Sequence, residues 1–394
     1  MSLPLIALFL AAFAFGTAEF VIAGVLPEVA LGLGVTVPVA GYLISGYAIG
    51  IAVGGPLLAL VTKKMRRKTL ILVLGSVFVA GQVLSALAPN FELLLLARLL
   101  VSFVHGTFFG IAAIVAVSIA PPNRKGFAVA LILAGLTVSN ILGVPGGTAV
   151  GSAYGWRATF WAVGAVGLLA TIVIALFLPA RAGEGASASS FRREFKALGR
   201  QQVWSSLLIA ALVMVGQYSL FTFIAPFLIE VTRLDTGTVP WMLLLYGVGS
   251  TAGVFIGGRL ADWNMMRSLT VILTAQAVLF IIVHLVSPYA VPMAFLALLW
   301  GGTNFAFGSP LQARILTWAS DAPNLASSLI PTAYNVGIAI GAILGAVLLE
   351  ANFGYANLPF IGAAASSLSV LLAIGSHLAE RRSSAIPPVS TLAG

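Results

Sequence analysis

The sequence contains no cysteine and little charge. None of its 394 residues is Cys, 8% are Asp, Glu, Lys or Arg, and 60% are hydrophobic. The lack of cysteine excludes a disulfide framework and any metal or redox centre built on thiols. A soluble domain carries about 25% charged residues. The composition, with a mean hydropathy of +1.08, therefore excludes a soluble enzyme with a single membrane anchor and indicates a polytopic membrane protein.

Signatures of ATP hydrolysis and of common catalytic sites are also missing. The chain has no G-x-x-x-x-G-K-[ST] motif, no HExxH motif and no paired acids or Ser/His/Asp set. Its three histidines, His105, His284 and His377, lie in different apolar stretches without metal-ligand spacing. We therefore expect neither an enzyme nor a primary transporter, and no cofactor.

The apolar stretches predict an all-α integral membrane fold. They are continuous, whereas barrel strands would alternate polar and apolar residues over short segments. Each is long enough to cross the hydrocarbon core of about 30 Å at about 1.5 Å per residue. The sequence predicts twelve spans, at 4–27, 38–61, 69–88, 91–119, 126–150, 156–179, 202–231, 238–261, 268–287, 290–316, 324–350 and 356–379.

The basic residues predict the orientation of the chain. All Lys and Arg residues fall in or beside alternate loops, except Arg157 and Arg233 on the opposite side and Arg98 within a span. Arg314, at the end of the span 290–316, is counted with the loops. By the positive-inside rule both termini lie in the cytoplasm, and twelve spans keep this alternation. We expect a multi-pass inner (plasma) membrane protein, whose net charge of +9 reflects topology and not nucleic-acid binding.

The chain divides into two similar halves. We expect six-helix bundles at 1–180 and 202–380, a polar cytoplasmic linker at 181–201 and a cytoplasmic tail at 381–394. Gly54-Gly55-Pro56 recurs as Gly257-Gly258-Arg259 before a basic loop, and the glycines of 143–155 recur near 337–354. Such repeats place a substrate site where the halves meet, near the membrane midplane.

Glu19 is the residue that most strongly suggests a function. It is the only charge between Leu3 and Leu26, and a carboxylate at this depth costs about 3 kcal/mol or more in transfer scales. Such a group persists where it faces a wet cavity, binds a proton or meets a partner. We therefore interpret Glu19 as a working residue of a transporter.

A glycine stripe follows in the span 126–150. Gly143, Gly147 and Gly151 recur every fourth residue, which leaves one helix face without side chains and lets a neighbouring helix approach closely. Pro145 removes a backbone hydrogen bond and predicts a bend. We interpret this segment, with Gly55, Gly258 and Asp262 near the basic loops, as conformational machinery.

Four segments together resemble a known family. Residues Gly143 to Gly151 resemble the proline-containing antiporter motif of the major facilitator superfamily, especially its twelve-span drug:proton antiporters of the arabinose-efflux and chloramphenicol-resistance branch. The segments that resemble the same branch elsewhere are Gly16 to Pro27, Arg98 to Gly110, and Gly155-Trp156-Arg157 to Phe160.

This resemblance implies the major facilitator fold, alternating access and proton-driven efflux, with Arg98 as a proton-coupling arginine. His105 either relays protons or packs as a neutral ring. The chain departs from the family in one loop, because no acidic residue lies between Glu28 and Glu92, so an inner ion pair that needs an aspartate there is absent. Asp262 keeps the corresponding aspartate in the second half. Glu28 and the other carboxylates near span ends are expected to be solvated.

Polar and aromatic residues at mid-span predict the substrate cavity. The expected cavity is large and mostly apolar, which suits a small amphiphilic molecule. Its predicted lining residues are Asn140, Gln217, Tyr218, Phe221, Asn304, Phe305, Tyr334 and Asn335.

We thus expect a monomeric drug:proton antiporter, of the kind that confers multidrug or antibiotic resistance, whose partners are substrate, protons and lipid. In the expected cycle, deprotonated Glu19 favours substrate entry from the cytoplasm, and protonation from outside displaces substrate and permits return. The alternatives are a proton-coupled exporter of sugars, nucleosides or purines, and a membrane scaffold or receptor in which Glu19 and Arg98 form a structural ion pair.

Overall fold

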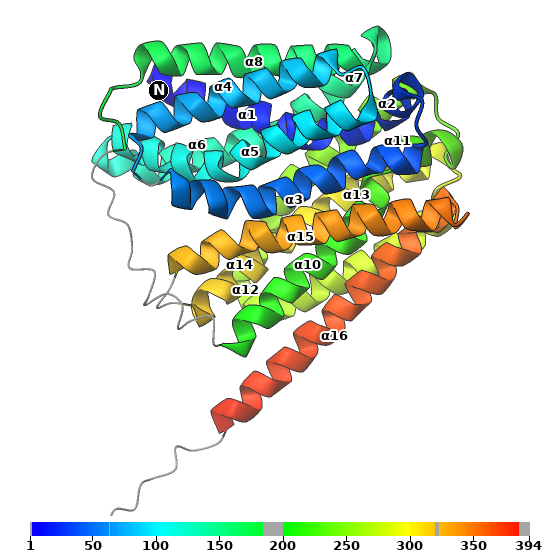
Figure 1. Cartoon of the computed structure of the whole chain (residues 1–394). Helices are drawn as coiled ribbons and strands as arrows, with labels where there is room; N and C mark the ends of the chain where they lie inside the picture. The colour runs from blue at the N-terminus through cyan, green and yellow to red at the C-terminus, as the bar shows by residue number, and fades with distance from the viewer. Residues whose placement is uncertain (1, 63, 184–199, 320–322, 386–394) are drawn as a thin grey trace, which may run out of the picture.

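The first half of the chain forms one layer of a large helical bundle, which we describe from a computed structural model. The structure describes residues 2–62, 64–183, 200–319 and 323–385, and the first half is uppermost in Figure 1. Its main helices are α1 (Leu3–Gly24), α2 (Leu26–Leu33), α3 (Val37–Val61), α4 (Arg67–Leu87), α5 (Phe91–Ile119), α6 (Lys125–Val138), α7 (Val144–Tyr154) and α8 (Trp156–Phe177), with a π-helical turn η2 (Ser139–Gly143) between α6 and α7.

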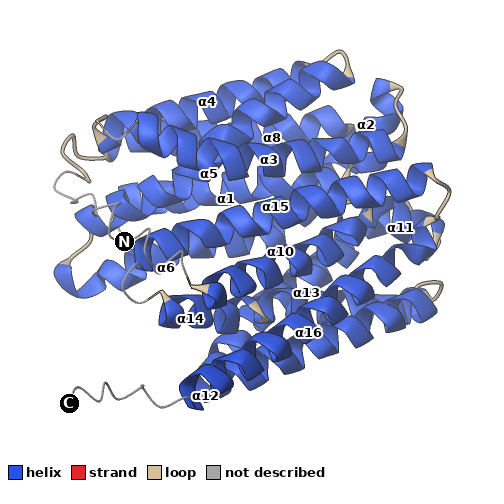
Figure 2. Ribbon diagram, turned by 60° about the horizontal axis from the view of Figure 1, so that its bottom comes forward, coloured by secondary structure: helices blue, strands red, loops and turns tan. Residues whose placement is uncertain are grey.

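The second half lies beneath it, and α3 packs along α15 where the halves meet (Figures 1 and 2). Within the described ranges every regular element is a helix, as predicted. The helices of this half are α10 (Gln201–Phe221), α11 (Ile224–Glu230), α12 (Val239–Val286), α13 (Ala290–Ala306), α14 (Gly308–Trp318), α15 (Pro323–Glu350) and α16 (Leu358–Ala385).

Eleven helical stretches among the described residues are long and apolar enough to cross a membrane, and one of them contains two spans. The helix α12 has 48 residues, which would extend about 72 Å, more than twice the hydrocarbon core. Asn264 interrupts it with φ −161° and ψ 99°. The Ser268 hydroxyl donates to the Leu260 carbonyl at 2.6 Å, so the chain turns back there. The spans predicted at 238–261 and 268–287 are therefore both present.

Two other predicted spans are broken near the end away from the basic loops. Val25 separates α1 from α2 with φ −116° and ψ 16°, and Phe223 separates α10 from α11 with φ −109° and ψ 25°. Pro27 and Pro226 follow these breaks and lack the N–H that a continuous helix needs. The predicted spans at 4–27 and 202–231 are therefore helical but interrupted, which the sequence pattern did not predict.

The two halves repeat the same local geometry. Gly155 and Gly354 both have positive φ, at 86° and 78°, with ψ of 151° and 144°. This conformation favours glycine, which has no Cβ to clash. The equivalence supports the predicted duplication. The predicted linker at 181–201 falls largely outside the described residues, as does the tail from 386 onward, and α16 extends to Ala385, beyond the predicted helix end at 379.

Two hydrophobic cores stabilise the bundle, and only one of them connects the halves. The first, which we call the joined core, packs Leu26, Val29 and Ala40 of the first half with Phe227 and Leu228 of the second, away from the basic loops. The other core contains described residues of the first half alone, on α1, α3, α4, α5, α6 and α8. The halves are thus held together by apolar contacts at the end opposite the basic loops.

Adjacent glycines on α12 differ in their surroundings. A Cβ on Gly257 would lie 2.8 Å from the Ala306 Cα of α13, whereas a Cβ on Gly258 would meet no described atom within 4 Å. Of the two, Gly257 and not Gly258 makes the close helix contact, and the conformational role expected of Gly258 stays a prediction. The first half has the equivalent contact at Gly55, where a Cβ would lie 3.2 Å from the Gly106 carbonyl oxygen of α5.

These neighbours give opposite expected effects on stability. Gly257→Ala should lower the free energy of unfolding by about 1–3 kcal/mol, the usual cost of overpacking. Gly258→Ala should leave it unchanged or raise it by up to about 1 kcal/mol through helix propensity. Thermal unfolding of the purified variants in detergent measures both. Equal changes of the unfolding temperature in the two variants would contradict the assignment of the close helix contact to Gly257.

Candidate functional site

Glu19 faces a histidine inside the first half. Its Oε2 lies 3.6 Å from Nε2 of His105, which is within ion-pair reach but longer than a hydrogen bond. The Glu19 side chain is 13% exposed and that of His105 is 6% exposed. The carboxylate is therefore close to a proton-exchanging ring, and a small part of its surface is left uncovered by protein.

Tyr47 on α3 completes a line of three exchangeable groups. Its hydroxyl lies 2.9 Å from Nδ1 of His105. We assign the hydroxyl as donor, which leaves the proton of a neutral imidazole on Nε2, directed at Glu19. Phe15 packs edge-on against the imidazole with centroids 5.4 Å apart. His105 is therefore oriented from both sides, by a hydrogen bond and by a ring.

Arg98 is fully buried and bonds to backbone oxygens. Its guanidinium donates to the carbonyls of Ala18 at 3.0 Å, Glu19 at 3.4 Å and Leu43 at 3.4 Å. It also lies 4.5 Å from the centroid of the Tyr47 ring, a cation–π contact. The residue is 1% exposed and does not reach the interface. These hydrogen bonds connect α5, which carries Arg98, to α1 and α3 near the Glu19 carboxylate.

The glycine stripe packs on the helix that carries Glu19. Positions 143, 147 and 151 face Thr17 and Val21 of α1 and Val25 at its C-terminal end, at spacings of four residues. In the second half Gly337, Gly341 and Gly345 of α15 face α10 in the same way. The close approach predicted for the stripe is therefore present, and its partner is α1.

Pro145 is accommodated by a π-helical turn. The turn Ser139–Gly143 directly precedes α7, and Pro145 lies in the first turn of that helix. Proline has no N–H to donate, and the wider π-helical turn accommodates the missing hydrogen bond. Asn140 lies in this turn, and its amide donates to the Leu136 carbonyl of its own helix at 3.2 Å. A Cβ on Gly247 of α12 would lie 2.9 Å from the Ile141 Cα, so this turn meets the second half.

A cluster of four rings lies in the second half beside this interface. We call it the ring cluster: Tyr218, Phe221, Tyr246 and Trp300. Phe221 lies 4.9 Å from Tyr246 and 6.0 Å from Trp300 between centroids. Phe20, next to Glu19, lies 6.3 Å from Tyr218. This ring contact links the first half to the second.

Two buried amides are bonded to the ring cluster. The Gln217 Oε1 accepts from the indole N–H of Trp300, and the Asn304 Nδ2 donates to the Tyr246 hydroxyl at 2.6 Å. The Gln217 Nε2 and Asn304 Oδ1 have no hydrogen-bond partner among the described residues. Four of the predicted cavity residues, Gln217, Tyr218, Phe221 and Asn304, are thus together.

The other predicted site residues lie apart from this group. The Asn335 amide donates to Pro331 of its own helix at 3.0 Å, Tyr334 packs on Phe307 at 5.9 Å, and Phe305 is partly buried against the joined core. Asp262 is exposed.

Two charges near predicted span ends are removed from solvent, one fully and one in part. Arg314 of α14 is fully buried and donates to Glu380 of α16 at 2.6 Å, so it joins two helices and is not a loop charge. Glu28 of α2 is half-buried and accepts from the Ser152 hydroxyl at 3.4 Å. Burial raises the pKa of the Glu28 carboxyl, and its hydrogen bonds oppose that rise.

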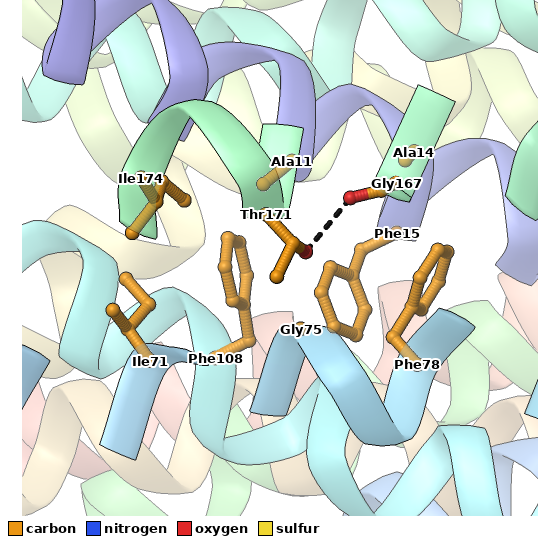
Figure 3. A pocket seen from close by; sticks show the side chains of 10 residues that line it. All are labelled: Ala11, Ala14, Phe15, Ile71, Gly75, Phe78, Phe108, Gly167, Thr171 and Ile174. Atoms are coloured by element: carbon orange, nitrogen blue, oxygen red, sulfur yellow. Dashed lines mark hydrogen bonds between the residues drawn. The ribbon is translucent and has the colours of Figure 1, made fainter. Parts of the chain in front are cut away.

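A small cavity lies among α1, α4, α5 and α8 of the first half and is shown in Figure 3. Its volume is about 10 Å³, room for about one water. Phe15, Phe78 and Phe108 line it, and the Thr171 hydroxyl bonds the Gly167 carbonyl of its own helix. A second cavity of the same size adjoins Tyr246 and Trp300. Neither has room for the amphiphilic substrate predicted from the sequence.

The sequence interpretation missed four residues of the site: Phe20, Tyr47, Tyr246 and Trp300. Tyr and Trp are most often interfacial in membrane proteins, so a tyrosine or tryptophan deep within a span is a signal that it needs a polar partner. That signal was available for Tyr47, Tyr246 and Trp300. It gave no partner, because His105, Asn304 and Gln217 lie more than 50 residues away along the chain.

Comparison with known proteins identifies the family. The profile of the Major Facilitator Superfamily matches residues 8–317. The chain is 38% identical to the inner membrane transport protein YdhP of Escherichia coli K12 over 94% of each chain. It is 35% identical to a chloramphenicol resistance protein of Streptomyces lividans, over 90% of this chain and 91% of that one. It is 31% identical to a probable sugar efflux transporter of Helicobacter pylori 26695 over 92% of each.

A solved structure shows the same fold. A bacterial homologue of the human lysosomal transporter Spinster superposes with a TM-score of 0.73 at 18% identity and covers 96% of each chain. With the helical spans described above, these relationships make the protein a multi-pass inner membrane transporter and not an enzyme, which excludes the scaffold or receptor alternative. The chain belongs to the major facilitator superfamily of secondary transporters.

Proposed function

We propose that the protein exports small amphiphilic compounds in exchange for protons. The observation that carries this proposal is the position of Glu19, a partly exposed carboxylate 3.6 Å from His105 and adjacent in the chain to Phe20, which contacts Tyr218 of the other half. A protonation event at Glu19 therefore occurs one residue from a contact that must change when the halves move.

The charge balance of the site supports coupling. Arg98 keeps its positive charge at working pH, and an ionised Glu19 balances it. A proton on Glu19 leaves the first half with one uncompensated positive charge, which favours a different arrangement of α1, α3 and α5. The line Tyr47–His105–Glu19 offers groups that can pass a proton.

The direction of transport rests on orientation and on relatives. The positive-inside rule places the basic loops and both termini in the cytoplasm. In that orientation the part of the joined core that contains Leu26, Val29, Phe227 and Leu228 closes the outer end, and substrate enters from the cytoplasmic side. Efflux is named for the probable sugar efflux transporter, which favours sugars as the alternative cargo, and the other relative is named for resistance to chloramphenicol.

Proton flux in proteoliposomes tests the proposal. With an imposed gradient, acid inside, we expect addition of chloramphenicol outside to dissipate the gradient, as reported by an entrapped pH-sensitive dye. Dissipation by arabinose instead would favour the sugar exporter. If a panel of amphiphilic compounds, sugars and nucleosides all left the gradient unchanged, proton-coupled export would be wrong.

A further inference from the structure

The ring cluster and its two amides contain hydrogen-bonding capacity that the protein does not use. The Gln217 Nε2 and Asn304 Oδ1 lack partners among the described residues, and these side chains are 0% and 5% exposed. Buried polar atoms without partners cost stability. A ligand that supplies the missing acceptor and donor would remove that cost.

The orientation of each amide is set by its partner. The indole N–H of Trp300 is a donor only, so the Gln217 oxygen must face it and the Gln217 nitrogen is left free. The Asn304 amide bonds the Tyr246 hydroxyl through one end, and its other end is free in either orientation. The site therefore offers a donor at Gln217 and a second amide end at Asn304.

The contact between the halves is the place where a ring could enter. Phe20 and Tyr218 come from different halves, and their centroids are 6.3 Å apart with planes inclined at 36°. A flat ring between two others needs two contacts of about 3.5 Å each, or about 7 Å. A separation of the halves by about 1 Å would admit an aromatic ring there.

The charges near the site restrict the ligand further. None of the described hydrogen bonds, ion pairs or cation–π contacts of the ring cluster involves Lys or Arg. Glu19 is adjacent to Phe20 and repels an anion when it is ionised. The site therefore disfavours carboxylates and phosphates.

We propose that Phe20, the ring cluster and the free amide ends of Gln217 and Asn304 bind a flat, uncharged aromatic compound that carries both a hydrogen-bond acceptor and a donor. This substrate class rests on the proposed export function, because it assigns the cargo of that transporter. It disfavours sugars, whose puckered rings have no flat π face to insert between two aromatic rings, and apolar aromatics, which gain no polar contact.

Binding to the purified protein tests the proposal with three probes. Chloramphenicol has a flat ring, an amide and hydroxyls; 4-nitrotoluene keeps the nitrophenyl ring alone; arabinose keeps hydroxyls alone. We expect the unmodified protein to bind chloramphenicol more tightly than 4-nitrotoluene, and arabinose not at all, by titration calorimetry and tryptophan quenching. Preferential binding of arabinose, or equal binding of the two aromatics, would overturn the proposal.

Asn304→Leu tests the polar contact itself. It should weaken chloramphenicol binding about tenfold, as expected for the loss of one hydrogen bond in a buried site. The affinity for 4-nitrotoluene should stay within about twofold of that of the unmodified protein. Gln276→Leu is the matched control, because Gln276 of α12 is also a fully buried amide with both ends unpaired among the described residues and it is not bonded to the ring cluster. The proposal would be overturned if Asn304→Leu weakened the binding of both probes or of neither. It would also be overturned if Gln276→Leu weakened chloramphenicol binding to the same extent.

These measurements separate the inference from the proposed function. Binding needs no proton gradient. Chloramphenicol binding without proton flux would therefore support the proposed binding site and refute proton-coupled export. Proton flux driven by arabinose, without chloramphenicol binding, would retain coupling and refute the substrate class.

Discussion

Glu19→Gln is expected to abolish proton-driven accumulation of substrate and to leave exchange down a concentration gradient intact. The amide keeps the shape of a protonated carboxyl but neither gains nor loses a proton. The ratio of substrate concentration inside the vesicles to that outside should fall to about one, which is the value without coupling between proton and substrate. Uptake of labelled substrate into proteoliposomes, with and without a pH gradient, measures both activities.

Glu350→Gln provides the control, because Glu350 is an exposed carboxylate at the end of α15 and should leave both activities unchanged. His105→Gln should slow proton-driven transport less than Glu19→Gln does, since it removes a neighbour of the carboxylate and not the carboxylate. Undiminished accumulation in Glu19→Gln would refute the coupling scheme.

Gly41→Leu is expected to hold the end opposite the basic loops open and to stop turnover. Phe223 is fully buried, and a Cβ on Gly41 of α3 would lie 2.7 Å from its ring. The ring cannot move aside easily, because a Cβ on Gly345 of α15 would lie 2.8 Å from its Cε2 atom. Overpacking of this kind costs about 1–3 kcal/mol, which would raise the open population about 5- to 150-fold.

The absence of native cysteine gives a direct measurement of this opening. Ala225 of α11 is 1% exposed, and Ala225→Cys adds a single thiol at the closed end. Alkylation by a membrane-impermeant maleimide should accelerate in Gly41→Leu and stay slow in Gly110→Leu, because a Cβ at Gly110 meets no described atom within 4 Å. If alkylation stays slow in Gly41→Leu and transport continues, the ring does not close this end.

The number and order of the spans could be predicted because each is a long apolar run, but their interruptions could not. Pro27, Pro226 and Pro145 each lie beside a break or π-helical turn, whereas Pro56 and Pro331 lie inside continuous helices. A proline removes one hydrogen bond in every case. Whether the helix breaks depends on the neighbours that pack against it, and these are not local in sequence.

The site was predictable in part for the same reason. Glu19, Arg98 and His105 are conspicuous because ionisable groups are costly within a span. The closeness of Glu19 to His105 and the backbone bonds of Arg98 depend on how α1 and α5 pack. The ring cluster depends on three separate helices, and only Tyr218 and Phe221 among its rings were expected. Isolated polar residues such as Asn140 and Asn335 bond their own helices, a local alternative that composition alone does not distinguish from a cavity wall.

The joined core also determines how transport should respond to temperature. Opening that end transfers the apolar side chains of Leu26, Val29, Phe227 and Leu228 from protein contacts to water. Such exposure carries a positive heat-capacity change, so the enthalpy of opening varies with temperature and the ratio of closed to open molecules follows a curve. Apolar contacts weaken on cooling. The closed end should therefore loosen in the cold, and a plot of the logarithm of this ratio against inverse temperature should bend where a fixed set of hydrogen bonds would give a straight line.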